Sequence, residues 1–88
     1  MDNREFINAA IAAVKDYINE EIKIEVDGEK VTKKDVFISW LSKTIENNKA
    51  LLGSNKRPRE YFEVTYNGID KEMYLDVYVK KDKKTIKL

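Results

Sequence analysis

The side chains best suited to binding chemistry are aromatic and basic, and they lie in the second half of the chain. Arg57 and Arg59 precede Tyr61 in the sequence RPREY, and Tyr74 and Tyr78 follow further along. Tyrosine and arginine are enriched at the energetic centres of protein interfaces, and aromatic rings beside arginines also hold single-stranded nucleic acids. We therefore take Arg57, Arg59, Tyr61, Tyr74 and Tyr78 as candidate partner-binding residues.

Acidic residues are interleaved with this set, and they favour a protein partner over a nucleic acid. Glu60, Glu63, Glu72 and Asp76 would repel a phosphate backbone, which is bound largely through charge. The formal net charge of +1 is also far below the basic balance of dedicated nucleic-acid binders. Nucleic-acid binding through the basic and aromatic segment 56–61 is the alternative. A third interpretation is structural, with the rings shielding an edge of a sheet.

The composition argues against catalysis. The chain has no histidine and no cysteine, which removes the commonest acid/base group near neutral pH, the commonest zinc ligands and every Ser/His or Cys/His pair. Glu63, Glu72 and Asp76 offer oxygen ligands, but the Asp-x-Asp-x-Asn-Gly spacing of a calcium loop is absent. We expect no enzymatic activity, no cofactor and no metal site.

The tyrosines are positioned by a β-hairpin over residues 60–80. Strict alternation predicts that three of them, Tyr61, Tyr74 and Tyr78, share one face, and Asn67-Gly68 is a strong turn signal. The turn leaves two registers open, one pairing Val64 with Met73 and one pairing Tyr66 with Met73, and both keep the same faces. The opposite, core-facing set is predicted to be Phe62, Val64, Tyr66, Met73, Leu75, Val77 and Val79.

An amphipathic helix over about residues 3–22 is expected to cover the core-facing set. Apolar residues recur at helical spacing, and Asp2 with Glu5 forms an N-terminal capping pair. We predict that Phe62, Val64, Leu75 and Val77 are buried against this stripe. Its members are Ile7, Ile11, Val14, Ile18 and Ile22.

The middle segment, residues 32–52, is compatible with two structures. Its apolar spacing fits a second helix begun by Thr32 and Asp35, whereas the β-branched and aromatic run DVFISW followed by Asn47-Asn48 fits a strand hairpin. In either case Trp40 is expected to anchor the core. A turn is predicted at Asp27-Gly28.

Three stretches, WLSKTIENNKALL, YFEVTYNG and KEMYLDVYVK, resemble a family of small proteins of unknown function encoded by phages and prophages of Gram-positive bacteria. The resemblance runs from the N-terminal helix to about Lys81. It implies a host or phage protein as partner and the cytoplasm of a bacterial host as the setting. It implies strands in the middle segment, although Leu41, Ile45 and Glu46 stand in a more helix-compatible context here. It supplies no catalytic residues.

Together these patterns predict one α+β domain spanning residues 1–88, with an N-terminal amphipathic helix on a small antiparallel meander. The opening MDNRE lacks the basic start of a secretory signal, and the apolar run INAAIAAV is too short to span a membrane. Exposed edge strands in so small a domain predict a tendency to form a symmetric homodimer.

Overall fold

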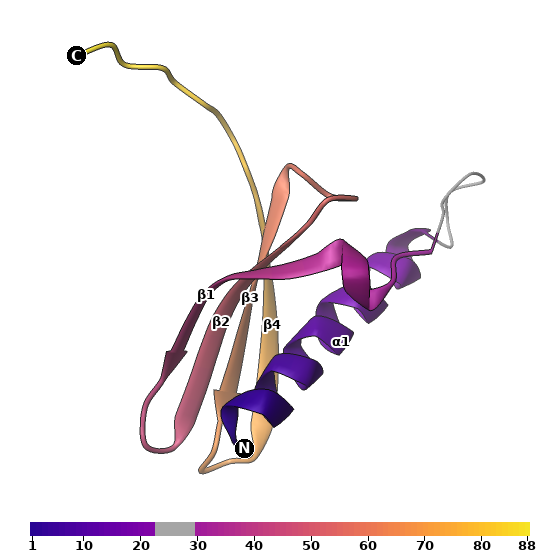
Figure 1. Ribbon diagram of the computed structural model, residues 1–88, viewed down its shortest axis with the longest axis vertical. Coiled ribbons are helices and arrows are strands. Elements are labelled where there is room, and N and C mark those ends of the chain that lie inside the picture. The colour runs from indigo at the N-terminus through magenta and orange to yellow at the C-terminus, as the bar shows by residue number, and fades with distance from the viewer. Residues whose placement is uncertain (23–29) are drawn as a thin grey trace.

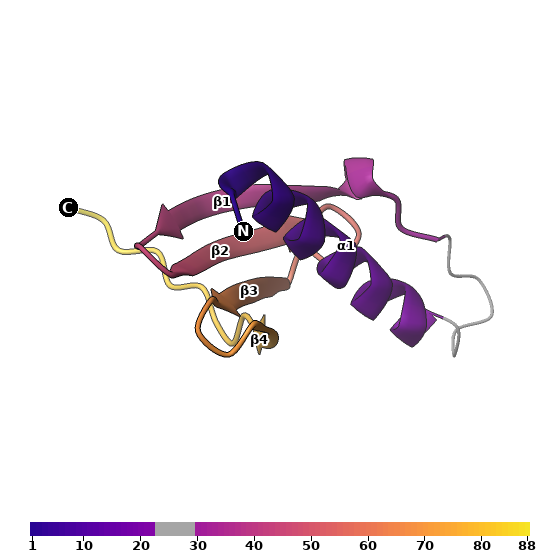
Figure 2. The same ribbon diagram turned by 90° about the horizontal axis from the view of Figure 1, so that it is seen from below.

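A computed structural model describes residues 1–22 and 30–88. Its strands form one antiparallel sheet in the order β1-β2-β3-β4, and α1 crosses one face of it (Figures 1 and 2). The α+β meander is confirmed, and the middle segment is a strand hairpin. The Asp27-Gly28 turn lies outside the described residues. The elements are α1 (Asn3–Ile22), the 3-10 turn η1 (Lys33–Asp35), β1 (Val36–Lys43), β2 (Asn47–Ser54), β3 (Glu60–Asn67) and β4 (Glu72–Val79).

Helix α1 begins as predicted, and its second half buries the predicted stripe while its first half does not. The Asp2 carboxylate accepts a hydrogen bond from the Glu5 amide at 2.8 Å, which satisfies one free donor of the first turn. Val14 and Ile18 of the predicted stripe are fully buried, whereas Ile7 and Ile11 are only half-buried. In the first half of the helix the buried positions are Phe6 and Ala10 instead, each one residue earlier than predicted. Burying the large ring of Phe6 removes apolar area from water, and small Ala10 lets the helix lie close to the sheet. The fully buried positions are Phe6, Ala10, Val14 and Ile18.

The core lies between α1 and the first three strands. Phe62 is fully buried at its centre, and its ring meets the edge of Tyr17 at a centroid distance of 6.0 Å. Leu75 and Val77 of β4 are only half-buried, which corrects the expectation that both are core residues. A helix is about 10 Å wide, whereas four strands spread over roughly 14 Å, so one helix cannot cover the fourth strand.

The β3–β4 hairpin adopts the second of the two registers. Tyr66 pairs with Met73, and the predicted division of residues between the two faces is confirmed. Asn67 orders the loop of residues 68–71, because its side-chain oxygen accepts hydrogen bonds from the amides of Ile69 and Asp70. Lys71 closes the loop in the left-handed region, with φ of 53°.

Candidate interaction surface

The face of the sheet opposite α1 has no covering layer in the part of the chain that the structure describes (Figure 2). We call it the open face. It carries five aromatic side chains, each between 39% and 54% exposed, where an ordinary solvated strand face would be polar. These residues are Phe37, Trp40, Tyr61, Tyr74 and Tyr78.

A β-bulge places Trp40 on the open face. Ile38 pairs with Leu52 and Trp40 pairs with Leu51, so Ser39 is an extra residue in β1. The insertion reverses the alternation beyond it, and Trp40 therefore points away from the helix. The Ser39 hydroxyl donates to the Leu51 carbonyl oxygen at 3.1 Å and holds the bulge. The prediction that Trp40 anchors the core is wrong for this reason.

Tyr61 and Tyr78 form the centre of the aromatic array. They are directly opposite in the β3–β4 ladder, and their rings are stacked with a centroid distance of 4.8 Å and an interplanar angle of 9°. Phe37 lies over Gly53, its partner in β2, so closely that a Cβ atom there would be 2.6 Å from the ring. These rings rest on neighbouring groups, so the surface is largely organised before any partner arrives.

Carboxylates lie in the next row of the open face. Glu63 is opposite Asp76, and the Lys49 ammonium is 3.8 Å from one Glu63 oxygen. The carboxylate of Glu63, with help from Asp76, raises the pKa of Tyr78 above its ordinary value. Two carboxylates therefore lie in the row next to the stacked tyrosines, one of them paired with Lys49.

Tyr74 lies further along β4, opposite Thr65. Its hydroxyl donates to a Glu72 carboxylate oxygen at 2.6 Å, and this hydrogen bond raises the pKa of Tyr74. The bond fixes the direction of the ring while leaving its faces accessible. All three predicted tyrosines thus lie on the same exposed face.

Arg57 does not join the tyrosines. Its guanidinium lies on the covered side, 3.2 Å from a Glu21 oxygen and 3.1 Å from a Glu60 oxygen, and its side chain is 18% exposed. It therefore ties the end of α1 to the start of β3. The hydroxyl of Tyr17 and the Arg57 guanidinium both lower the pKa of Glu21, with the hydroxyl giving the larger effect.

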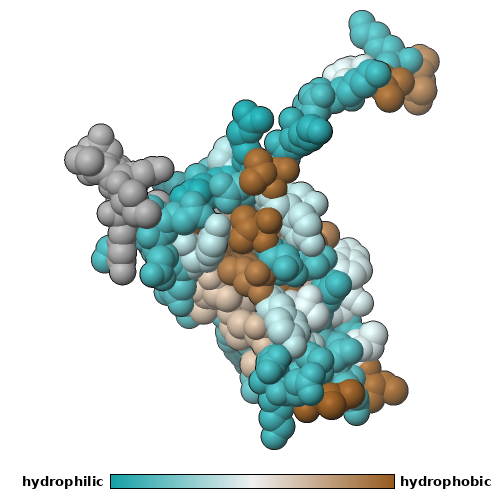
Figure 3. Space-filling view, turned by 180° about the vertical axis from the view of Figure 1, so that it is seen from behind, coloured by the Kyte–Doolittle hydropathy of each residue, from teal (hydrophilic) through white to brown (hydrophobic). Residues whose placement is uncertain are grey.

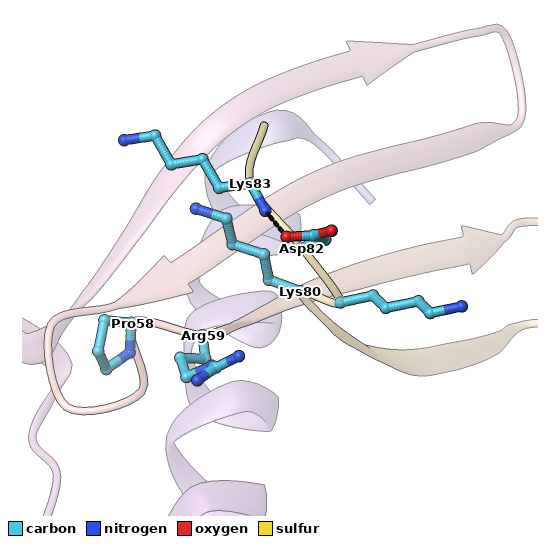
Figure 4. Close-up of a pocket in the computed structure, with 6 residues that line it drawn as sticks. Pro58, Arg59, Lys80, Asp82 and Lys83 are labelled. Atoms are coloured by element: carbon cyan, nitrogen blue, oxygen red, sulfur yellow. Dashed lines mark hydrogen bonds between the residues drawn. The ribbon is translucent and has the colours of Figure 1, made fainter. Parts of the chain in front are cut away.

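Arg59 is exposed at the end of the sheet next to the stacked tyrosines, where its carbonyl oxygen accepts the Lys80 amide at 2.7 Å. Here the start of β3 and the chain leaving β4 border an open hollow of about 410 Å³ (Figure 4). The Asp82 carboxylate accepts the Lys83 amide within it. The hollow is predominantly basic, and its lining is Pro58, Arg59, Lys80, Lys81, Asp82 and Lys83.

A second hollow, of about 290 Å³, lies beside Trp40. Its other lining residues are polar and include Ser42, Lys49 and Thr65. An apolar ring with polar groups around it is the arrangement that receives an anchoring side chain of a protein partner.

Sequence reasoning missed Phe37 and Trp40 as surface residues. Their separation of three fits one face of a strand only if an extra residue is inserted between them, and that spacing was the available signal. Among the described residues, no group of three acidic side chains gathers closely enough to hold a metal ion. The described part of the chain also has no helix long and apolar enough to cross a membrane.

Comparison with curated proteins and with solved structures finds no match for the chain. A family model, by contrast, matches residues 7–88, which span the open face, both hollows and nearly all of α1. The chain belongs to DUF6275, a family of unknown function.

Proposed function

We propose that this protein acts without catalysis, by capturing a protein partner on the open face of its sheet. The observation that carries the proposal is the array of five exposed aromatic side chains on a face without a covering layer in the described structure. Aromatic rings supply large contact area at small entropic cost, and polar groups around them supply hydrogen bonds.

Charge favours a protein over a nucleic acid at this face. Glu63 and Asp76 lie beside the stacked tyrosines and raise the pKa of Tyr78. Carboxylates at this position would repel a phosphate backbone, whereas a protein surface can supply basic side chains to pair with them.

The resemblance to phage and prophage proteins suggests the setting. We place the protein in the cytoplasm of a bacterial host, where its partner is a host or phage protein and its action is to inhibit or modulate a host function. A small binding domain suits this role, because blocking a protein surface needs contact area rather than a catalytic group.

Affinity capture from host lysate tests the proposal. The wild-type chain should retain a protein partner after nuclease treatment, and Tyr74→Ala or Tyr78→Ala should each weaken capture by about 2 kcal/mol, while leaving the fold intact. Ile45→Ala is the matched control, because Ile45 is 98% exposed in the β1–β2 loop. Full retention by both tyrosine variants, or loss of all partners with nuclease, would contradict the proposal.

Nucleic-acid binding is the second candidate, and the basic hollow is the observation that favours it. Arg59, Lys80 and Lys83 gather beside the stacked pair, where bases could stack while the cations hold phosphates. In that case the protein should bind single-stranded nucleic acid. The double change Arg59→Ala with Lys83→Ala should then reduce, by about two, the magnitude of the slope of the logarithm of the binding constant against the logarithm of the salt concentration. Arg57 is excluded from this test because its pairing with Glu21 is structural.

A further inference from the structure

The two edges of the sheet differ in how open they are to another strand. β1 is interrupted by the bulge at Ser39, a device that discourages pairing along an edge. β4 pairs with β3 through eight consecutive positions, from Glu72 to Val79, without a shift in register. Its outer edge is therefore regular.

The backbone groups at that outer edge can be assigned from the ladder. The Lys80 amide donates to Arg59, so Lys80 and every second residue before it direct their backbone groups towards β3. The alternate residues, Met73, Leu75, Val77 and Val79, direct theirs outward. Four residues thus offer amides and carbonyls to an added strand.

The side chains of these four residues form an apolar strip on the helix side of β4. Met73 is 38% and Val79 67% exposed, and Leu75 and Val77 are half-buried at the margin of the core. Seen from the β4 side, apolar surface runs down the middle of the molecule from the base of the extended C-terminal segment (Figure 3). Pairing at this edge would remove apolar area from water.

We propose that β4 pairs with β4 of a second copy, antiparallel and centred on Tyr78, to form a continuous eight-stranded sheet. In this register Asp76 is opposite Lys80 of the second copy, and Glu72 is opposite Lys84. Two-fold symmetry repeats both pairs, so the interface has four complementary charge pairs. Across the whole paired range, residues 72–84, no like charges are opposed. Residues 80–84, which extend beyond the sheet in Figure 1, become its outer partners.

The backbone pattern fits the same register. Val77 and Val79 of opposite copies form hydrogen-bonded pairs through their outward amides and carbonyls. The even-numbered residues fall at non-hydrogen-bonded positions, where opposed side chains are closest. Asp76 therefore meets Lys80 at short range, and the two Tyr78 rings meet at the symmetry axis.

Neighbouring registers are poorer in charge matching. Centring on Asp76 would place that carboxylate opposite itself, and centring on Val77 would place Glu72 opposite Asp82. Centring on Leu75 would leave Glu72 and Asp76 facing tyrosines. Opposed like charges across strands are destabilising and opposite charges are stabilising, so the Tyr78 register, with four complementary pairs and no opposed like charges, is favoured.

This pairing would also extend the open face. The stacked Tyr61 and Tyr78 rings of one copy would lie beside those of the other, doubling the length of the aromatic array. The inference concerns the β4 edge and does not depend on the proposed partner capture.

Disulfide crosslinking of introduced cysteines tests the register of the β4–β4 pair directly. The natural chain has no cysteine, so each disulfide joins only the introduced residues. At the symmetry axis the two Cα atoms of residue 78 should lie about 4.5 Å apart, within disulfide range, while those of residues 76 and 74 should be about 14 Å and 27 Å apart. Under mild oxidation Tyr78→Cys should form covalent dimers at least roughly tenfold faster than the matched controls Asp76→Cys and Tyr74→Cys. Fastest crosslinking at residue 76 or 74, or equal slow rates at all three, would overturn the proposal.

Charge exchange gives an independent test by sedimentation. Asp76→Lys and Lys80→Asp should each raise the dimer dissociation constant about tenfold, because each opposes like charges twice. The double variant should return to within about threefold of the wild type. A wild-type monomer at about 1 mM, or a dimer indifferent to both single changes, would exclude this edge as the site of self-association. Circular dichroism verifies that each variant is folded.

Discussion

The two faces of the sheet differ in which apolar residues they carry and in how exposed those residues are. The covered face holds Leu52, Phe62 and Val64, all fully buried, whereas the open face holds Trp40 and Tyr78 with large exposed fractions. The buried residues have no polar tip that would need a partner, while the tyrosines and tryptophan on the open face keep a polar group at the ring edge. Composition therefore separates the core from the proposed binding surface, and mutations on the two faces should have separable effects.

Phe62→Ala should produce the largest loss. The ring is fully buried and packs against Tyr17 of α1, so its removal leaves a cavity where the helix meets the sheet. We expect the free energy of unfolding to fall by about 3 to 5 kcal/mol. Chemical denaturation measures this. A loss under about 1 kcal/mol would mean that the helix does not cover β3 in solution.

Leu75→Ala tests the margin of the covered face. Leu75 pairs with Val64, packs against the margin of the core and is half-buried. Leu75→Ala should therefore lower the free energy of unfolding by about 1 to 2 kcal/mol, which is less than the same substitution costs at a fully buried leucine. A loss as large as that of Phe62→Ala would show that β4 is covered, for instance by a second copy, and the loss should then depend on protein concentration.

The sequence predicted the two faces well because alternation and helical spacing are local properties. Phe62, Val64 and the three tyrosines fall on their predicted sides, and the capping by Asp2 is present. Trp40 was misplaced because a bulge is visible only once β1 is paired with β2. Arg57 was misplaced because its partner Glu21 is 36 residues away in the sequence. The positions of Trp40 and Arg57 both depend on long-range pairing, which the periodicity of the sequence does not encode.

Glu21→Gln tests, through the pH dependence of stability, whether the contacts of Glu21 on the covered side hold in solution. In the fold, hydrogen bonds from Tyr17 and Arg57 lower the pKa of Glu21 below its ordinary 4.5. A depressed carboxyl pKa contributes stability above the unfolded value, and this contribution is lost as the pH falls through the folded value. The variant should therefore lose less stability than the wild type between about pH 6 and about pH 3. Denaturant midpoints across that range measure the difference.

The exposed neighbour Glu20 provides the control, because Glu20→Gln removes the same charge from the same end of α1 without touching the contacts of Glu21. Asp2 and Asp35 also have lowered pKa values, through hydrogen bonds from the amides of Glu5 and Thr32, so they too contribute to the acid dependence of stability. The comparison of the two glutamine variants is needed to isolate Glu21. Equal pH profiles for the two would show that the ties to Tyr17 and Arg57 contribute nothing measurable in solution.

Trp40 should give the smallest effect on stability and the most direct report on the open face. As the single tryptophan, 48% exposed, it provides an unambiguous fluorescence signal. Trp40→Ser should lower the free energy of unfolding by less than about 1 kcal/mol, because the ring is on the uncovered side of the bulge. In the wild type, its emission should be readily quenched by acrylamide and should change little on unfolding. Partner capture on the open face should then shift the emission to shorter wavelength and protect it from quenching, since binding removes water from the ring. Trp40 emission at short wavelength that acrylamide does not quench, in the isolated monomer, would show that Trp40 is buried. It would contradict the assignment of Trp40 to the exposed face.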